Sequence, residues 1–423
     1  MKKSRVVVYS ALLLLLGSVG SQAQQSLAST GNGDSNAGSQ AVSNVSGTGT
    51  QRTLPQCSGQ ASRLPGSIAG PCKPVLAGTQ TQQLSNDLPR HDDGAIYVEF
   101  VVPGSTCEAS FALCTTPVAI NLFGAVTGYY ADANAALHGF VRTPSGTITT
   151  FDGPDATCPN ASVCTSPVGI NLQGAITGFY CDAVTCHGFV RAPGGTITAF
   201  DPPESVFTQF FTGGINRAGV ITGTYYDANY LAHGFLRTPG GSFTSFDALG
   251  TVNGTVPTGI NDAGEVVGWY YDSNFVSHGF LRALDGTLTT FDPKGSIYTS
   301  ANAINVNGAI TGVWQDASFA FHGFLRSREG AITTFDVPGS NGETEPSAID
   351  PAGAITGNFV AVSGGFHGFV RASDGTFTTF DPTGSAEPSS YTFANGINPA
   401  GMITGWYIDP SFIGHGFLRI PIQ

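Results

Sequence analysis

Short runs of alternating apolar and polar residues repeat through this chain from Ala119 to Arg419. A typical unit holds an Ile-Asn step, a Gly-x-Ile-Thr-Gly segment, a His-Gly-Phe-Val/Leu-Arg segment and a segment ending in Phe-Asp. In the third unit these segments are residues 214–216, 220–226, 233–237 and 242–247. Glycine, asparagine and proline steps between them predict tight turns. The pattern therefore predicts four short antiparallel strands in every unit.

The His-Gly-Phe tripeptide marks the period of the repeat. It begins at His138, His187, His233, His278, His322, His367 and His415, with spacings of 49, 46, 45, 44, 45 and 48 residues. A four-stranded unit with this period is typical of a propeller blade. The N-terminus aside, no long segment has helical periodicity. We expect an all-β fold.

The two ends of the repeat region predict how the array closes. Phe-Asp follows only six of the seven His-Gly-Phe segments, because the last unit stops at Gln423 without a fourth strand. The segment Ile96–Val101, before the first unit, resembles the fourth strand at residues 332–336. Supplying it to the last unit would remove exposed sheet edges. We therefore predict a seven-bladed β-propeller over residues 95–423, closed by an N-terminal strand that completes the last blade.

The first residues have the pattern of a secretory signal. Lys2, Lys3 and Arg5 precede the apolar stretch Val6–Val19, and Ala23 ends a small-x-small cleavage site. A membrane anchor is the alternative, but the apolar stretch is shorter than the roughly 20 residues that a span needs. We predict a signal peptide at 1–23 and no membrane span after its removal. Residues 24–94, rich in Ser, Gly, Gln and Thr, predict a flexible low-complexity spacer.

Eight cysteines fall into four local couples: Cys57 with Cys72, Cys107 with Cys114, Cys158 with Cys164, and Cys181 with Cys186. In an exported protein such couples predict disulfides. A metal site is the alternative, which the absence of any Cys-x-x-Cys spacing disfavours. We expect no metal site and no cofactor.

Charge excludes one class of partner. The net charge is −12, and from Ala95 onward 10 Lys and Arg stand against 25 Asp and Glu, so this region carries about −15. Seven of those ten basic residues are the arginines of the repeated motif. No basic patch is left to neutralise phosphates, so nucleic-acid binding is not expected.

The units resemble the His-Ala-Phe (HAF) extracellular repeats, which are propeller-like modules of secreted bacterial proteins. The resemblance rests on Gly-x-Ile-Thr-Gly, the aromatic residue and Asp after it, and His-x-Phe, and it covers residues 95–423. Two features depart from the family: the middle residue is Gly in all seven copies, and the next strand ends in Phe-Asp instead of Asp-Leu-Gly. The resemblance implies a propeller and export, and no activity.

The repeated polar residues predict structural roles. A three-residue hairpin loop would place His138 across from Asp152 and His233 across from Asp247, so we interpret the histidines as blade fasteners and not as a metal or catalytic site. The arginines are expected to bond blade carboxylates or carbonyls. An aromatic residue in every unit predicts packing between blades, with sugar stacking as the alternative: Tyr130, Tyr180, Tyr225, Tyr270, Trp314, Phe359 and Tyr407.

Function is expected where the repeat varies. The loops that join one unit to the next run from 13 to 20 residues between Phe and Ile, and six of the eight cysteines fall on the same face. Carboxylates and aromatics of this face are Asp155, Glu204, Glu343, Glu345, Glu387, Phe210, Phe211, Tyr230, Phe275 and Phe412. We predict no catalytic residues and a monomeric binding or scaffold module that engages extracellular glycan or protein. It would act outside the cell, at its surface or in the periplasm. The alternative is a secreted polysaccharide lyase or glycoside hydrolase, which would need two of those acids close together.

Overall fold

The computed structural model describes residues 93–106, 114–157, 164–208, 213–251, 254–382 and 391–422. The chain divides into two units, residues 1–82 and 83–423, and every described residue belongs to the second. The regular elements assigned in these ranges are all strands, which confirms the all-β prediction. The predicted signal peptide and most of the predicted spacer lie outside the described residues.

The strands pair in antiparallel sets of four, which we call blades 1 to 7 in chain order. Blade 1 is β2 (Thr115–Ile120), β3 (Val126–Ala131), β4 (Leu137–Arg142) and β5 (Ile148–Phe151). Blade 2 is β6 (Thr165–Ile170), β7 (Ile176–Cys181), β8 (Cys186–Arg191) and β9 (Ile197–Phe200). Blade 3 is β10 (Gly214–Ile215), β11 (Ile221–Tyr226), β12 (Ala232–Arg237) and β13 (Phe243–Phe246). Blade 4 is β14 (Thr255–Ile260), β15 (Val266–Tyr271), β16 (Ser277–Arg282) and β17 (Leu288–Phe291). Blade 5 is β18 (Tyr298–Ile304), β19 (Ile310–Gln315), β20 (Phe321–Arg326) and β21 (Ile332–Phe335). Blade 6 is β22 (Ser340–Ile349), β23 (Ile355–Ala361), β24 (Phe366–Arg371) and β25 (Phe377–Phe380). Blade 7 is β26 (Tyr391–Ile397), β27 (Ile403–Ile408), β28 (Gly414–Pro421) and β1 (Ala95–Phe100).

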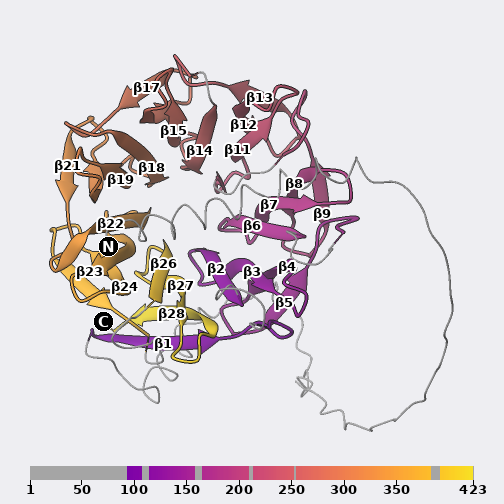
Figure 1. Ribbon diagram of the computed structural model, residues 1–423. Coiled ribbons are helices and arrows are strands. Elements are labelled where there is room, and N and C mark those ends of the chain that lie inside the picture. Colours follow the sequence, from indigo (N-terminus) through magenta and orange to yellow (C-terminus); the bar gives the residue numbers. More distant parts are fainter. Residues whose placement is uncertain are drawn as a thin grey trace, which may run out of the picture. The chain divides into compact units, whose positions relative to one another are not determined.

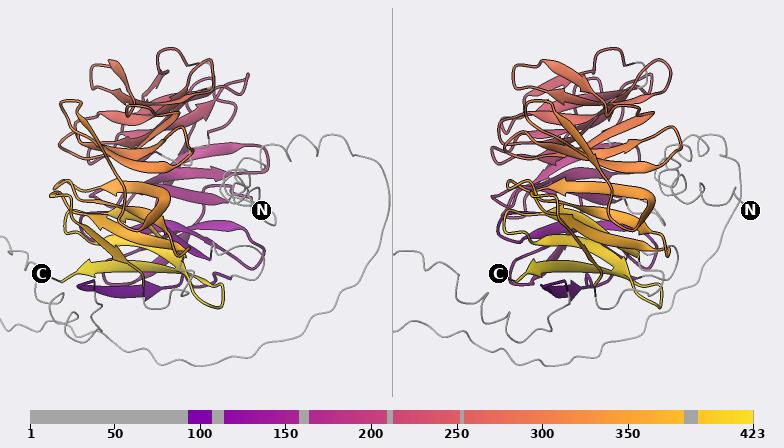
Figure 2. Two further views of the ribbon diagram at one scale, coloured as in Figure 1. Left: turned by 60° about the vertical axis from the view of Figure 1, so that its left-hand side comes forward. Right: turned by 90° about the vertical axis from the view of Figure 1, so that its left-hand side faces the viewer.

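The blades stand around a common axis, with first strands such as β2, β6 and β26 near the centre and fourth strands such as β5, β9 and β21 at the rim (Figure 1). Seen from the side, the strands run across the thickness of the ring (Figure 2). Because neighbouring strands are antiparallel, the 1–2 and 3–4 turns emerge on one face, the turn face. The 2–3 hairpins and the loops between blades emerge on the other, the hairpin face.

A close contact gives a physical reason for both departures from the HAF pattern. A Cβ atom built on Gly139 would lie 2.9 Å from the Phe151 ring of the neighbouring strand. The same steric conflict arises at Gly188, Gly234, Gly279, Gly323 and Gly368, each against the Phe of its own Phe-Asp segment. The phenylalanine that ends the fourth strand therefore occupies the space that an alanine methyl group would need.

The seven motif arginines link neighbouring blades through cation–π contacts. Each guanidinium lies 4.9–5.1 Å from the ring centre of the fourth-strand phenylalanine of the preceding blade: Arg142 over Phe100, Arg191 over Phe151, Arg237 over Phe200, Arg282 over Phe246, Arg326 over Phe291, Arg371 over Phe335 and Arg419 over Phe380. These contacts join the third strand of one blade to the fourth strand of the blade before it.

The hydrogen bonds predicted for these arginines are present in six blades. Five of the arginines donate to the backbone carbonyl of the next residue, as Arg142 does to Thr143 at 3.3 Å. Arg419 instead donates to the Asp93 carbonyl at 3.3 Å. It is also the one motif arginine that forms an ion pair within the described ranges, with the Asp93 carboxylate at 2.7 Å.

The N-terminal strand β1 takes the fourth position in blade 7. It pairs with β28 along its whole length, from Ala95 opposite Pro421 to Phe100 opposite Gly416. Phe100 also does what a fourth-strand phenylalanine does elsewhere: its ring covers Gly416 and receives Arg142 of blade 1. Asp93, which the sequence assigned to the spacer, is anchored to Arg419, so the folded region begins by this residue.

Candidate functional sites

The seven histidines lie on the third strand of each blade, where they tie the hairpin face together. As predicted, His138 Nδ1 lies 2.9 Å from Asp152, and His233 Nδ1 lies 2.9 Å from Asp247. A second aspartate, which begins the 2–3 hairpin, lies on the other side of most rings; Asp132 is 3.5 Å from His138 Nε2. The pattern of an imidazole between two carboxylates recurs in blades 1 to 5. These contacts support a structural role for the histidines.

In blade 2, neighbouring groups shift the pKa values of His187 and of Asp182. Burial disfavours the charged form of His187, but hydrogen bonds and charges from Asp201 and Asp182 outweigh it and raise the pKa of the imidazole. The backbone N–H of Thr185, with further hydrogen bonds, lowers the pKa of the Asp182 carboxyl. The pair therefore favours the protonated histidine in the folded state.

The predicted interblade aromatics pack as expected. Tyr180 fills the space beside Gly153 of blade 1, where an added Cβ would collide with the tyrosine ring. On the other side the ring lies against the His187 ring, at a centroid distance of 5.3 Å. Tyr180, Tyr225, Tyr270 and Tyr407 are buried, which leaves no ring face open for a sugar at these positions.

The tips of the 2–3 hairpins expose apolar side chains to solvent. Tyr230, Phe275, Phe319 and Phe412 are 64–74% exposed at equivalent positions in blades 3, 4, 5 and 7. Val184 and Val362 are also exposed on the corresponding hairpins of blades 2 and 6. We call the four aromatic residues the aromatic tips. The sequence indicated Tyr230, Phe275 and Phe412 but missed Phe319, which alignment of the seven units on the preceding aspartate would have found.

Each aromatic tip is held in an unfavourable backbone conformation. Their φ angles are +61 to +66°, a region that bulky side chains rarely adopt. The aspartate that starts the turn stabilises it: Asp272 accepts the backbone N–H groups of Asn274 and Val276 at 2.8 and 2.9 Å. Glycine or asparagine would suit such a position better. A rigid turn that displays an exposed aromatic ring at this cost is typical of a contact surface.

The predicted loop acids that the structure describes lie in three different parts of the ring. Asp155 and Glu204 take left-handed φ angles of 56° and 71° in the loops that follow blades 1 and 2. Glu343 and Glu345 belong to β22, and Glu345 accepts a hydrogen bond from Asn358 at 3.2 Å. Glu387, Phe210 and Phe211 lie outside the described residues.

For one predicted disulfide, both cysteines lie within the described residues and are bonded to each other. Cys181 and Cys186 are bonded across the β7–β8 hairpin, where they are directly opposed. Cys114 and Cys164 each take part in a disulfide as well.

The other predicted disulfides stay predictions. Cys107 and Cys158, the expected partners of Cys114 and Cys164, lie outside the described residues. Cys57 and Cys72 both lie outside them as well, so the structure does not test the disulfide predicted between these two. In the described ranges no group of three or more His, Cys, Asp and Glu side chains could hold a metal ion.

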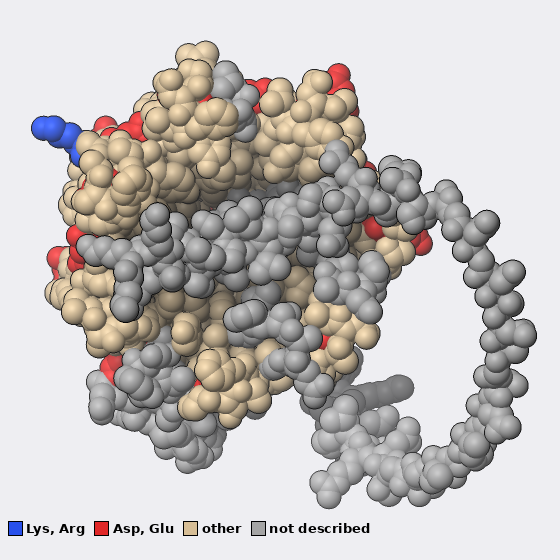
Figure 3. Space-filling view, viewed as in Figure 1, with Lys and Arg blue, Asp and Glu red and all other residues tan. Residues whose placement is uncertain are grey.

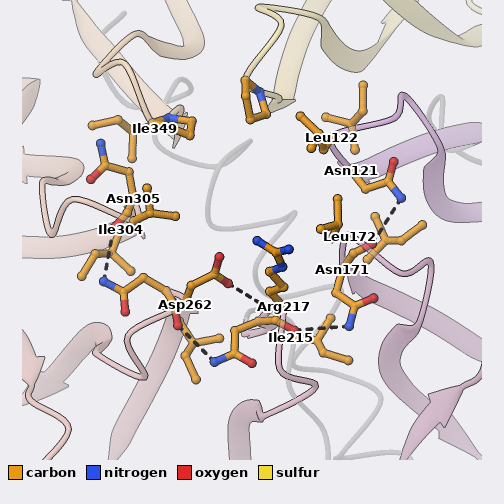
Figure 4. A pocket seen from close by; sticks show the side chains of 18 residues that line it. Asn121, Leu122, Asn171, Leu172, Ile215, Arg217, Asp262, Ile304, Asn305 and Ile349 are labelled. Atoms are coloured by element: carbon orange, nitrogen blue, oxygen red, sulfur yellow. Dashed lines mark hydrogen bonds between the residues drawn. The ribbon is translucent and has the colours of Figure 1, made fainter. Parts of the chain in front are cut away.

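A cavity of about 300 Å³ lies on the axis, where the first strands end at the turn face. Its walls are the repeated isoleucines, and the asparagines that follow them link the blades into a belt (Figure 4). Each of six asparagines donates from Nδ2 to a backbone carbonyl of the next blade at 2.9–3.3 Å: Asn121, Asn171, Asn216, Asn261, Asn305 and Asn398. Asp350 takes the seventh position and its side chain has no N–H to donate, so the belt has one missing bond between blades 6 and 7.

The rim of this cavity breaks the repeat. The residue after the asparagine, or after Asp350 in blade 6, is apolar in five blades, as Leu122, Leu172, Val306, Pro351 and Pro399. In the two adjacent blades 3 and 4 it is Arg217 and Asp262. Asp262 Oδ1 accepts the backbone N–H of Arg217 at 2.9 Å, and the Arg217 guanidinium points toward the middle of the cavity (Figure 4). The sequence pattern predicted function on the opposite face and indicated neither residue.

Comparison with known proteins supports the fold alone. No family model and no curated protein matches the chain. Among solved structures, the β-propeller domain of the Trilobed protease from Pyrococcus furiosus is 9% identical, with a TM-score of 0.52 over 74% of this chain and 94% of that one. This likeness confirms the propeller architecture.

Two further structures are similar at lower TM-scores. Virginiamycin B lyase from Staphylococcus aureus is 14% identical, with a TM-score of 0.47 over 78% of this chain and 100% of that one. The Aleuria aurantia lectin in complex with α-methyl-L-fucoside is 13% identical, with a TM-score of 0.41 over 66% of this chain and 100% of that one.

Proposed function

We propose that this protein is an exported binding module whose hairpin face engages a glycan through the aromatic tips. The observation that carries the proposal is the repeated, exposed aromatic ring in a left-handed turn. Burial of an aromatic side chain stabilises a fold, but these four rings are mostly in solvent. Their position instead suits stacking against an apolar face of a ligand.

The spacing of the aromatic tips favours a repeating ligand over a single compact one. Tyr230, Phe275 and Phe319 stand on three consecutive blades, and Phe412 stands on blade 7. Separate rings at equivalent positions allow several weak contacts to one chain at once, and such contacts multiply in affinity. A polar residue precedes the aromatic residue in each turn, as Asn229, Asn274, Ser318 and Ser411.

Charge limits the class of glycan. Acidic side chains are scattered over the visible described surface, where basic ones show at a single place (Figure 3). A net charge of −12 repels polyanions. We therefore infer an uncharged polysaccharide as the ligand. Export is supported by the disulfide between Cys181 and Cys186, and no helix in the described residues is long and apolar enough to cross a membrane.

A variant with all four aromatic tips changed to glycine tests the proposal. Glycine relieves the left-handed backbone, so the variant should fold at least as well as the natural protein. Binding to an immobilised panel of neutral polysaccharides should fall by about tenfold or more, because aromatic contacts contribute about 0.5–1.5 kcal/mol each beyond area burial. Phe123→Ala is the matched control, since this ring is 65% exposed on the turn face.

The outcomes separate the alternatives. Loss of polysaccharide binding in the glycine variant, with binding retained in Phe123→Ala, supports the proposal. Unchanged binding in the glycine variant contradicts it. A fall in the chain length of the bound polysaccharide during incubation would favour the enzyme alternative, and capture of a protein in place of any glycan would make the face a protein-binding surface.

A further inference from the structure

The axial cavity at the turn face has a separate function from the hairpin face: we infer that it binds a small carboxylate with an apolar body. The inference starts from Arg217, one of ten basic residues from Ala95 onward. Seven of the ten are motif arginines on phenylalanine rings, and Arg328 pairs with Glu265 at 3.3 Å. Lys294 lies in a loop between blades on the hairpin face. Arg217 is therefore the basic residue of this region that lies at the axial cavity.

Among the described residues, the Arg217 guanidinium has no structural partner that would explain its presence. No hydrogen bond or ion pair joins its guanidinium to the residues that the structure describes, although its backbone N–H is bonded to Asp262. The other six blades form the same turn with an apolar or acidic residue at this position, so the turn does not require an arginine. A guanidinium presents a rigid fork of donors that matches a carboxylate in two parallel hydrogen bonds.

The walls of the cavity define the rest of the ligand. Isoleucine side chains such as Ile215, Ile260 and Ile304 line it, while the Nδ2 groups of the asparagine belt are already used between blades. An apolar body therefore fits behind the carboxylate. A cavity of about 300 Å³ suits a small molecule and not a polymer. Asp262 lies beside Arg217 and accepts only one described hydrogen bond, so it can accept a hydroxyl group next to the carboxylate.

The test uses the full chain and three probes of one shape. By isothermal titration calorimetry, 4-methylpentanoate should bind, and 4-methylpentanamide, which lacks the charge, should bind about tenfold more weakly or worse. 2-Hydroxy-4-methylpentanoate should bind more tightly than 4-methylpentanoate, and Asp262→Leu should remove that advantage.

Arg217→Leu is the decisive variant, because Leu122 and Leu172 already occupy the same position in blades 1 and 2. It should keep the thermal midpoint of the natural protein and weaken 4-methylpentanoate by about tenfold or more. Arg217→Gln gives a second, polar replacement in case the leucine alters folding. Three results would overturn the inference. They are equal binding of the acid and the amide, binding by both Arg217 variants as tight as that of the natural protein, and no saturable binding of either acid. The glycine variant of the aromatic tips should bind these probes normally, so the two proposals fail independently.

Discussion

At the scale of single residues, the repeated polar groups act as fasteners. In blades 1 to 6 the histidine stands on the third strand and reaches the Asp that follows the fourth, as in His278 and Asp292 at 2.7 Å. Most of the histidines also reach the aspartate of the 2–3 hairpin. One imidazole therefore connects a hairpin to the loop that leaves the blade, and the hairpin face is stiffened blade by blade. The same hairpin aspartates accept the backbone N–H groups of the turns that hold the aromatic tips, as Asp272 does beside His278.

The raised pKa of His187 predicts a pH-dependent contribution to stability. The folded pKa lies above the unfolded value of about 6.5, so the contribution is complete below that pH and is lost as the pH rises through the folded pKa. His187→Asn should therefore destabilise the protein by about 0.5 kcal/mol near pH 5.5, the usual size of an accessible ion pair, and by less near pH 8.5. Urea denaturation at several pH values measures this difference.

Asp201→Asn provides the matched comparison, because it removes the carboxylate that bonds His187 Nδ1 at 2.7 Å. Like His187→Asn, this change should reduce the difference between the free energies of unfolding at low and at high pH. A constant cost of His187→Asn across the range would contradict the assigned role of the charge.

At the scale of elements, the asparagine belt joins the inner ends of the first strands. Every bond runs from a side chain of one blade to the backbone of the next, so the belt fixes the spacing of blades around the cavity. The hydrogen bond missing at Asp350 is the exception, and its effect on the stability of the protein can be measured.

Asp350→Asn should complete the belt. The new Nδ2 group can donate to the carbonyl of Asn398, while Oδ1 keeps the hydrogen bond that it accepts from the Ala354 N–H at 2.8 Å. We expect a stabilisation of about 1 kcal/mol, the usual net value of one hydrogen bond. Asn305→Asp is the reverse change and should destabilise the protein by a similar amount. A loss of stability in Asp350→Asn would show that the aspartate has another role.

The sequence predicts elements better than the contacts between them. His138 and Asp152 could be paired from hairpin arithmetic, because both belong to one pair of neighbouring strands. Arg142 could not be assigned to Phe100, since that contact depends on how two blades pack. Arg217 and Asp262 are also invisible to local reasoning. They become neighbours on a rim only when successive first strands converge at the axis.

At the scale of the whole molecule, blade 7 is built from both ends of the folded region. β28 pairs with β27 on one side and with β1 on the other, and Asn398 bonds blade 7 to blade 1. The ion pair between Arg419 and Asp93 secures the same junction over 326 residues of sequence. The N-terminal strand is therefore part of the ring.

Truncation measures how much the ring depends on this strand. Removal of residues 1–90 retains Asp93 and β1, so the thermal midpoint should stay near that of the full chain. Removal of residues 1–102 takes away β1, exposes one edge of β28 and leaves Arg142 without the Phe100 ring. We expect that shorter chain to melt at least several degrees lower, in line with a loss of a few kcal/mol. Equal midpoints for the two truncations would contradict the role given to β1.

The pairing of β1 with β28 also sets an order of events during synthesis. β1 precedes the other described strands of the ring and β28 follows them, so a growing chain carries β1 unpaired while the intervening blades are translated. Contacts between residues so far apart in sequence form slowly, because the chain between them must first be ordered. We therefore expect sealing of the ring to come late in folding, and a chain released before β28 is complete to keep an open edge available to other strands.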